Sequence, residues 1–260
     1  MLPARRPAVE AAGARWAPTV REAVGGAQVV FTALPGSPEL LELVVGSDGL
    51  LPHLPPGSCW VDLTSASPEV SRRCSAHASR LGVAHLDAPL GGGVPAVVAG
   101  DVVLYVGGDA DTLTEVTPVL RRFAATMHHV GGHGAGHLVK LLVNTLWFGQ
   151  VGLVTEAVLL AGRHGIAGEH LRTLLLGSAG DSAFVRQHLP RLLAGDVMAD
   201  FGLDRCVEEL AAVETAAADA GVPHPVTSAV ADLHRAALAH FGAVDGELLA
   251  GAWLRDQVSG

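Results

Sequence analysis

Apolar residues form short continuous runs in the first half of the chain. Such runs are typical of strands buried in a sheet. Five of them are predicted to be strands: residues 27–34, 58–63, 84–87, 102–106 and 127–130. Helical patterns separate the strands, and two begin with Ser-Pro-Glu, at residues 37–39 and 67–69. This triplet supplies an N-cap, a proline for the first turn and an acid. Alternating strands and helices predict βαβ units and a mostly parallel sheet.

After Gly136 the pattern becomes entirely helical. The apolar spacing predicts helices at residues 138–164, 169–176, 182–193, 204–220, 227–241 and 246–258, the third interrupted by Pro190. The fold class is therefore α/β: a truncated Rossmann-like parallel-sheet domain, a long connecting helix and an all-α C-terminal domain. We expect a partial dinucleotide-binding domain at residues 1–133 and a helical substrate and dimerisation domain at residues 134–260.

Composition narrows the classes of function. The chain has 260 residues and a net charge of −9, which argues against nonspecific nucleic-acid binding. Its longest uncharged apolar run, residues 141–155, is too short to span a bilayer. Three cysteines without CxxC spacing fit free thiols in a reducing cytosol. We expect a cytoplasmic protein without nucleic-acid or membrane partners.

Histidines cluster before the long helix, at positions 128, 129, 133 and 137. A spacing of four on one helix is compatible with zinc binding. Four glycines interrupt this segment, however, and glycine disfavours a continuous helix. No carboxylate or cysteine lies nearby in the sequence to complete a ligand set. No metal site is expected.

The stretch Gly134-Ala135-Gly136 leads into the long apolar helix, which carries Lys140 and Asn144. Positions four apart share a helix face, so the two side chains point in the same direction. An amine beside an amide can protonate a carbonyl oxygen and hold it in place. The alternative is that Lys140 is an ordinary solvated helix lysine.

Four blocks of sequence occur in an order and at spacings that point to one family. They are Leu34-Pro35; Asp-Leu-Thr-Ser-Ala-Ser-Pro at residues 62–68; Asp-Ala-Pro-Leu-Gly-Gly-Gly at residues 87–93, followed by Ala99-Gly100; and the segment from Gly134 to Asn144. Together they resemble the β-hydroxyacid dehydrogenase family, which includes 3-hydroxyisobutyrate dehydrogenase and tartronate semialdehyde reductase. The resemblance runs from about Arg5 to Val258.

The resemblance implies hydride transfer between NAD or NADP and a small carboxylate-bearing substrate, either an aldehyde or a β-hydroxy acid. Lys140 is then the proton donor in reduction and the acceptor in oxidation. Asn144 is expected to bond the same oxygen or the substrate carboxylate.

The remaining blocks imply binding roles. Backbone N–H groups of Gly91, Gly92 and Gly93 are expected to hold the substrate carboxylate. Leu34 and Pro35 are expected under the cofactor. Ser65 is expected beside the nicotinamide, against cofactor or substrate. For each of these residues the structural alternative is a tight loop or a strand-end cap without a ligand.

One departure concerns the start of the chain. No G-x-G-x-x-G precedes the strand that ends at Leu34, so about thirty residues of the family's first βαβ unit have no counterpart. We expect Met1 to be internal to a longer protein. Arg5 and Arg6 lie where the resemblance places a ribose-reading loop, which slightly favours NADP as the cofactor.

Two further departures concern the site. Gly91 replaces the serine of the family's substrate loop, and Glu208-Glu209 replaces a Lys-Asp pair whose lysine faces the cofactor. A glutamate there should weaken dinucleotide binding. Two alternatives therefore stay open: a cofactor-free homologue acting as a binding or scaffold module, and an imine-reductase-like enzyme. Lys140 disfavours the second, because imine reductases usually carry another residue at the matching position.

The helical half is strongly apolar, notably at residues 153–161 and 210–218. Apolar helices with few charges seek a partner surface. The resemblance implies a homodimer or homotetramer formed through this half. The alternative is a well-packed monomeric bundle.

Overall fold

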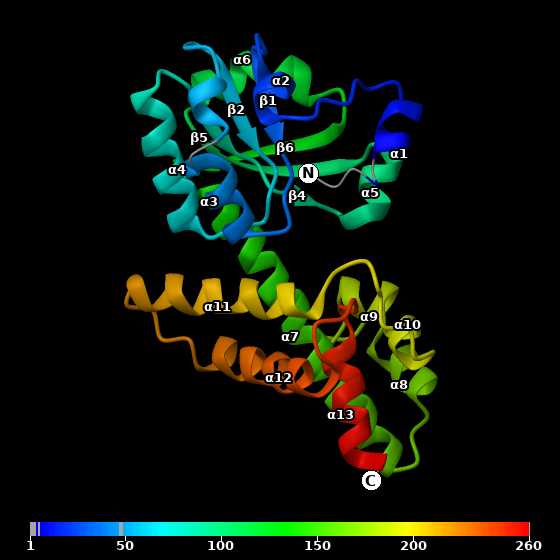
Figure 1. Ribbon diagram of the computed structural model, residues 1–260. Helices are drawn as coiled ribbons and strands as arrows, with labels where there is room; N and C mark the ends of the chain where they lie inside the picture. The colour runs from blue at the N-terminus through cyan, green and yellow to red at the C-terminus, as the bar shows by residue number, and fades with distance from the viewer. Residues whose placement is uncertain (1–3, 5, 47–48, 260) are drawn as a thin grey trace. The chain divides into compact units, whose positions relative to one another are not determined.

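The computed structural model describes residues 4, 6–46 and 49–259. The chain divides into two compact units, with the boundary between Lys140 and Leu141 (Figure 1). This boundary falls inside the long helix, whereas the predicted division at residues 133 and 134 falls just before it. The first unit contains a six-stranded sheet with helices, and the second unit is helical.

The sheet has the strand order β1-β2-β3-β5-β4, and β6 pairs with β5. The strands are β1 (Val29–Thr32), β2 (Cys59–Asp62), β3 (Ala84–Asp87), β4 (Leu90–Gly91), β5 (Val102–Gly108) and β6 (Ala124–Gly131). Three pairings are parallel, but β5 runs antiparallel to both β3 and β4. A mostly parallel sheet was predicted, and the reversed direction of β5 was not foreseen. Strand β4 has only two residues, which is too short for a hydrophobic pattern to reveal, and the antiparallel pairing of β4 with β5 needs only a short connection.

Helices lie on both faces of this sheet. The helices of the first unit are α1 (Arg6–Ala11), α2 (Val20–Val24), α3 (Ser37–Val45), α4 (Pro68–Arg80), α5 (Gly93–Ala99) and α6 (Ala110–Leu120), with a 3₁₀ turn at Leu51–His53. Trp60 packs with α3 and α4 in one apolar core, whereas its neighbour Val61 packs with α6 in another. Adjacent residues of a strand face opposite sides, so β2 is buried from both sides.

The two Ser-Pro-Glu triplets do begin helices, but with different caps. Ser67 caps α4 by accepting the N–H of Val70 at 3.2 Å. Ser37 lies inside the first turn of α3, whose N-cap is Gly36. The Ser37 hydroxyl instead accepts the N–H of Ser67 at 2.9 Å. The expectation that Ser37 caps its own helix was wrong, because its oxygen pairs with the neighbouring helix start.

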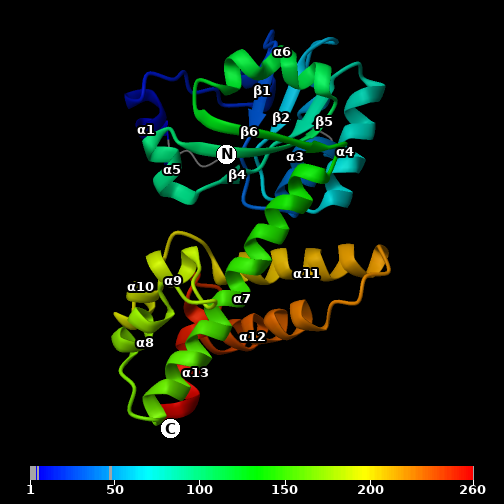
Figure 2. The ribbon, with the colours of Figure 1, turned by 180° about the vertical axis from the view of Figure 1, so that it is seen from behind.

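Most of the long helix α7 (Ala135–Arg163) lies in the second unit. The unit also contains α8 (Gly168–Leu175), α9 (Ala183–Gln187), α10 (Leu189–Leu193), α11 (Leu203–Asp219), α12 (Pro225–Phe241) and α13 (Leu249–Ser259). The helix predicted at residues 182–193 with an interruption at Pro190 is two short helices that break at His188, because Pro190 lacks an N–H to continue the pattern. Helices α11 and α12 lie side by side (Figure 2).

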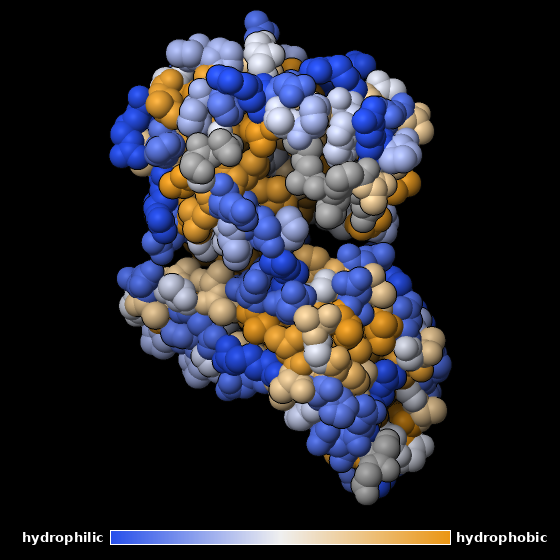
Figure 3. All heavy atoms as spheres, viewed as in Figure 1, coloured by the Kyte–Doolittle hydropathy of each residue, from blue (hydrophilic) through white to orange (hydrophobic). Residues whose placement is uncertain are grey.

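One face of α7 is apolar and exposed. Its most exposed leucines are Leu146, Leu153 and Leu160, at 71%, 69% and 64%, and we call them the α7 leucine stripe. Apolar side chains reach the surface of this unit elsewhere too (Figure 3). Within the described part of the chain, α7 alone has the length and composition to cross a bilayer. Core helices of globular proteins pass the same test, and so do helices that pair with another copy.

Candidate active site

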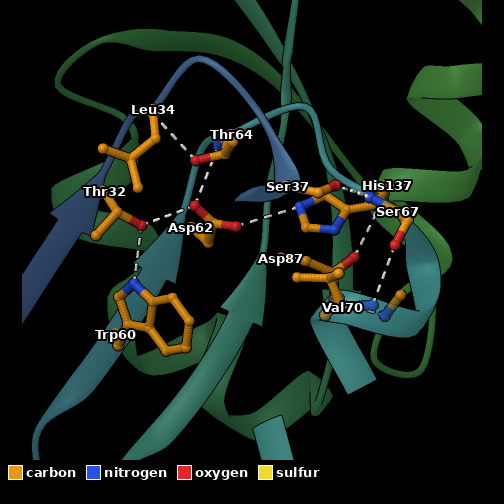
Figure 4. A network of polar contacts seen from close by, with 12 residues as sticks. Thr32, Leu34, Ser37, Trp60, Asp62, Thr64, Ser67, Val70, Asp87 and His137 are labelled. Atoms are coloured by element: carbon orange, nitrogen blue, oxygen red, sulfur yellow. Dashed lines mark hydrogen bonds and ion pairs between the residues drawn. The ribbon is translucent and has the colours of Figure 1, made fainter. Parts of the chain in front are cut away.

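Three polar residues stand at the carboxyl ends of the parallel strands. Thr32, Asp62 and Asp87 end β1, β2 and β3 and are in register with one another. All three are buried. Asp62 Oδ1 accepts the Thr32 hydroxyl at 2.7 Å and the N–H of Thr64 at 3.2 Å (Figure 4). The indole N–H of Trp60 donates to the Thr32 oxygen at 2.9 Å. In open α/β sheets, ligands bind at this edge.

Several predicted cofactor residues gather at the same edge. The N–H of Leu34 donates to Thr64 Oγ1 at 3.2 Å, which ties the segment after β1 to the segment after β2. Leu34 and Ser65 are half-buried, and Pro35 is exposed. These three residues therefore lie close together within the first unit. Their predicted contacts with a cofactor stay predictions.

Only one of the two arginines predicted to read the ribose lies among the residues that the structure describes. Arg5 lies outside the described residues. Arg6 is exposed on α1, and its Nε donates to Glu10 at 2.9 Å. An exposed pair one helical turn apart is weak and easily broken, so this contact leaves Arg6 able to meet a phosphate.

The glycine loop predicted to hold the carboxylate is split between two elements. Gly91 is buried in β4 and pairs with Val103. Gly92 and Gly93 are exposed and begin α5 with φ angles of 99° and 65°. A Cβ on Gly91 would lie 3.1 Å from the ring of Tyr105, so a serine there requires the ring to move. The side chain of Tyr105 thus occupies the space next to the position where the family has its serine.

That tyrosine is a residue that the sequence analysis missed. The Tyr105 hydroxyl lies 3.4 Å from the point where a Gly91 Cβ would be. Tyr105 is the only tyrosine of the chain. A hydroxyl therefore remains near this position although the serine is absent. Only the register of β4 against β5 brings the two residues together, and a two-residue strand gave no sign of it.

Lys140 is half-buried on α7 and is the only lysine in the sequence; the other sixteen residues counted as Lys or Arg are arginines. Asn144 follows it by one turn on the same helix. The amide of Asn144 donates through Nδ2 to Oε2 of Glu209 at 2.5 Å. Glu209, on α11, is 7% exposed. A buried carboxylate thus fixes the orientation of the Asn144 amide.

The two glutamates that replace a Lys-Asp pair therefore differ in role. Glu209 bonds Asn144, whereas Glu208 accepts Nη1 of Arg205 at 2.8 Å on the same helix. The sequence suggested that a glutamate here reverses the charge beside a dinucleotide. The ion pair with Arg205 reduces that charge locally.

The histidines that suggested zinc do not converge. His128 and His129 are on β6, and His137 is on α7. His129 contacts the carbonyl oxygen of Gly108 at 2.8 Å. Among the described residues, no group of three His, Cys, Asp or Glu side chains is arranged to hold a metal ion.

Comparison with known proteins adds family models for both halves. Residues 3–131 match the NAD binding domain of 6-phosphogluconate dehydrogenase. Residues 134–250 match a domain described as NAD-binding of NADP-dependent 3-hydroxyisobutyrate dehydrogenase. The chain belongs to the β-hydroxyacid dehydrogenase family. The resemblance found in the four sequence blocks is thereby confirmed, and nicotinamide-cofactor-binding domains are present.

Individual relatives differ in their sequence identity to this chain and in how much of it they cover. The NAD-dependent L-serine dehydrogenase of Pseudomonas aeruginosa is 35% identical over 170 residues, which are 65% of this chain and 57% of that protein. The chain thus spans little more than half the length of this relative. The solved Mycobacterium tuberculosis 3-hydroxyisobutyrate dehydrogenase with L-serine is 27% identical, with a TM-score of 0.87, and covers 97% of this chain and 89% of its own.

An imine reductase from Streptomyces aurantiacus is also similar in structure. It has a TM-score of 0.60 at 22% identity and covers 98% of this chain and 88% of its own. At this identity the likeness concerns the fold alone. The predicted layout of a sheet domain, a long helix and a helical domain is confirmed by the two family models and the Mycobacterium tuberculosis structure.

Proposed function

We propose that the chain is an NAD(P)-dependent oxidoreductase acting on a small carboxylate-bearing β-hydroxy acid or the corresponding aldehyde. One observation carries this proposal: the only lysine of the chain stands at the family's catalytic position. Arginine remains protonated at any physiological pH and cannot exchange a proton, whereas lysine can. A chain that uses arginine for every other such cation has lysine where the proposed chemistry needs proton transfer.

Each residue of the proposed site has a separate role in the reaction. A bound nicotinamide supplies or accepts the hydride. Lys140 gives a proton to the forming alkoxide during reduction and removes it during oxidation. Asn144, with its amide held by Glu209, orients the same oxygen.

Residues of the first unit bind the substrate and the cofactor in this proposal. The backbone N–H groups of Gly91, Gly92 and Gly93 hold the substrate carboxylate. Leu34, Pro35 and Ser65 lie against the cofactor. The relatives' names indicate the substrate class, since L-serine and 3-hydroxyisobutyrate both carry a hydroxyl one carbon beyond the carbon that bears the carboxylate.

Cofactor binding tests the proposal most directly. Titration of the purified protein with NADPH or NADH, followed by nucleotide fluorescence, is expected to saturate. NADPH should bind more tightly than NADH, because Arg5 and Arg6 favour a 2′-phosphate. Lys140→Ala serves as the matched control and should bind cofactor normally. A flat titration up to millimolar nucleotide would reject the oxidoreductase and favour a cofactor-free binding module.

An imine-reductase-like activity is the second candidate, supported by the likeness of fold. Lys140 disfavours this candidate, because imine reductases usually carry another residue at the matching position. Turnover of L-serine or 3-hydroxyisobutyrate without turnover of a cyclic imine is the expected result, and the reverse preference would favour the imine reductase.

The same proposal includes self-association, in the cytoplasm, as a homodimer or homotetramer. The α7 leucine stripe supports it, because Leu146, Leu153 and Leu160 repeat every seven residues, the period of paired helices. The three cysteines are free, in keeping with a reducing compartment.

Leu153→Glu is expected to convert the oligomer into monomers, because it places a charge in the middle of the apolar contact. Light scattering after size exclusion measures the mass. Leu174→Glu on α8, where the leucine is 56% exposed outside the stripe, is the matched control and should leave the mass unchanged. A monomeric wild type, or a Leu153→Glu protein of unchanged mass, would contradict this interface.

A further inference from the structure

A carboxylate from another element holds the first turn of α7. Asp87, the last residue of β3, accepts the N–H of Gly134 at 2.8 Å through Oδ1 and the N–H of His137 at 3.1 Å through Oδ2. These N–H groups are among those that a helix start leaves without a partner in the helix. The negative charge also faces the positive end of the helix dipole. The start of α7 is thereby fixed to the carboxyl end of β3.

A second contact involves the ring of His137. Its Nε2 lies 3.4 Å from Oδ2 of Asp62, and both side chains are fully buried (Figure 4). Asp62 is itself held by the Thr32 hydroxyl. The bond from the His137 backbone limits sliding of the helix along its axis, and the ring contact limits rotation about that axis. Two contacts of different direction therefore define one placement of the first turn.

The backbone of this turn packs closely against the neighbouring strands. A Cβ on Gly136 would collide with the carbonyl oxygens of Tyr105 and Asp87. A Cβ on Gly107 would lie 2.5 Å from Oδ2 of Asp87. Gly134 has a φ of 89°, which disfavours any other residue. These three glycines, in β5 and at the start of α7, thus let the helix backbone lie directly against β3 and β5.

We propose that Asp87 is a positioning residue for Lys140, which it aims by capping α7 from the neighbouring strand. Lys140 follows His137 by three residues, close to one turn along the helix and near the same face. The direction of the lysine side chain follows from the placement of that turn. The catalytic consequence rests on the proposed function, whereas the positioning itself is a property of the chain alone.

The proposal needs a carboxylate rather than an amide. Two backbone donors reach the two oxygens of Asp87. An asparagine offers one oxygen and an NH₂ group. Asp87→Asn therefore sets a donor against one of the two N–H groups and removes the charge facing the helix start.

The single lysine makes the consequence visible by NMR. Labelling with ¹³C-lysine gives one lysine side-chain spin system in the whole protein, that of Lys140. In the wild type we expect separate shifts for its two Hε protons, as in a side chain that keeps one orientation. In Asp87→Asn these shifts should merge, kcat should fall about 10- to 100-fold, and the cofactor Kd should stay within about threefold.

Ser71→Ala is the matched control. The Ser71 hydroxyl, on α4, donates to Oδ1 of the same carboxylate at 3.1 Å, whereas the two N–H groups from the start of α7 reach that carboxylate separately. The lysine spectrum and kcat of this variant should match the wild type. An unchanged lysine spectrum in folded Asp87→Asn overturns the proposal. Equal changes in Ser71→Ala also overturn it, since they would reflect general damage to the buried network.

Two further measurements apply if Asp87→Asn does not fold. Amide exchange in the wild type should show Gly134 and His137 strongly protected, and exchange as fast as in an exposed loop would overturn the proposal. His137→Asn keeps the backbone bond but loses the ring contact with Asp62. In this variant the shifts of the two Hε protons of Lys140 should move toward each other. Shifts identical to those of the wild type would contradict the proposal that the ring contact limits rotation of the helix.

The outcomes also separate this inference from the proposed function. Merged Hε shifts in Asp87→Asn, with no dehydrogenase activity in any variant, would support positioning and reject the oxidoreductase. Full activity of Asp87→Asn with unchanged shifts would keep the oxidoreductase and reject positioning.

Discussion

Lys140→Ala is expected to lower kcat about 100-fold or more while leaving the cofactor Kd near the wild-type value. Removal of a general acid usually costs a factor of this size. The loss should appear in kcat and kcat/KM together, because the proton moves only as the reaction proceeds. Stopped-flow measurement of NADPH oxidation or NADH formation, with separate cofactor titrations, checks both numbers.

Lys140→Arg separates proton transfer from charge. The guanidinium keeps the positive charge but cannot release its proton at the pH of the assay. If Lys140 acts as general acid and base, the arginine variant should be about as slow as the alanine variant. The converse exchange, Arg163→Lys at the far end of α7, is the matched control and should leave kcat unchanged.

The arginine result decides between two roles. Retention of most of the activity in Lys140→Arg would mean that the ammonium acts as a fixed charge. A mild effect in both variants would identify Lys140 as an ordinary helix lysine, the alternative that the sequence left open. The second outcome would remove the observation on which the oxidoreductase proposal depends.

Patterned segments predicted most of the fold. The apolar run around Val30 and the Ser-Pro-Glu triplets located β1, α3 and α4 within a few residues. Burial imposes a visible spacing on such segments. Strand β4 and helix α5 were not predicted, because residues 91–98 contain only Gly, Val, Pro and Ala and show no polar alternation, and because none of the α5 residues is buried. Their structure depends on pairing with β5, which is encoded elsewhere in the chain.

Side-chain partners were harder to predict than site residues. Lys140 and Asn144 are four apart on one helix, so local geometry predicts their common face. Asp87 meets Gly134 across 47 residues, and Asn144 meets Glu209 across 65. No local spacing reports contacts between residues so far apart. One signal was present: Asp87 begins one of the four family-like blocks and Gly134 begins another.

Lowering the pH from about 6.5 toward 3 is expected to reduce stability through His85. Its ring is 4% exposed and lies between Trp60 and His133, with ring centroids 4.2 Å and 5.5 Å away. Burial, assisted by the nearby His133 and His137 and opposed by Asp87, lowers the pKa of His85 from 6.5 to about 3. Between these pH values His85 is protonated in the unfolded chain but neutral in the folded chain. The free energy of unfolding therefore falls by up to about 1.4 kcal/mol for each unit that the pH is lowered.

A variant isolates this contribution from the other titrating groups. His85→Phe keeps an aromatic ring against Trp60 but cannot bind a proton. Urea unfolding, followed by tryptophan fluorescence between pH 7.5 and 4, should give a shallower decline in the free energy of unfolding than the wild type shows. The difference should correspond to about one proton below pH 6 and vanish above pH 7. His164→Gln, at an exposed histidine after α7, should retain the wild-type slope. Parallel slopes for His85→Phe and the wild type would mean that the buried ring accepts its proton in the folded state, through rearrangement of the contacts around Trp60 and His133.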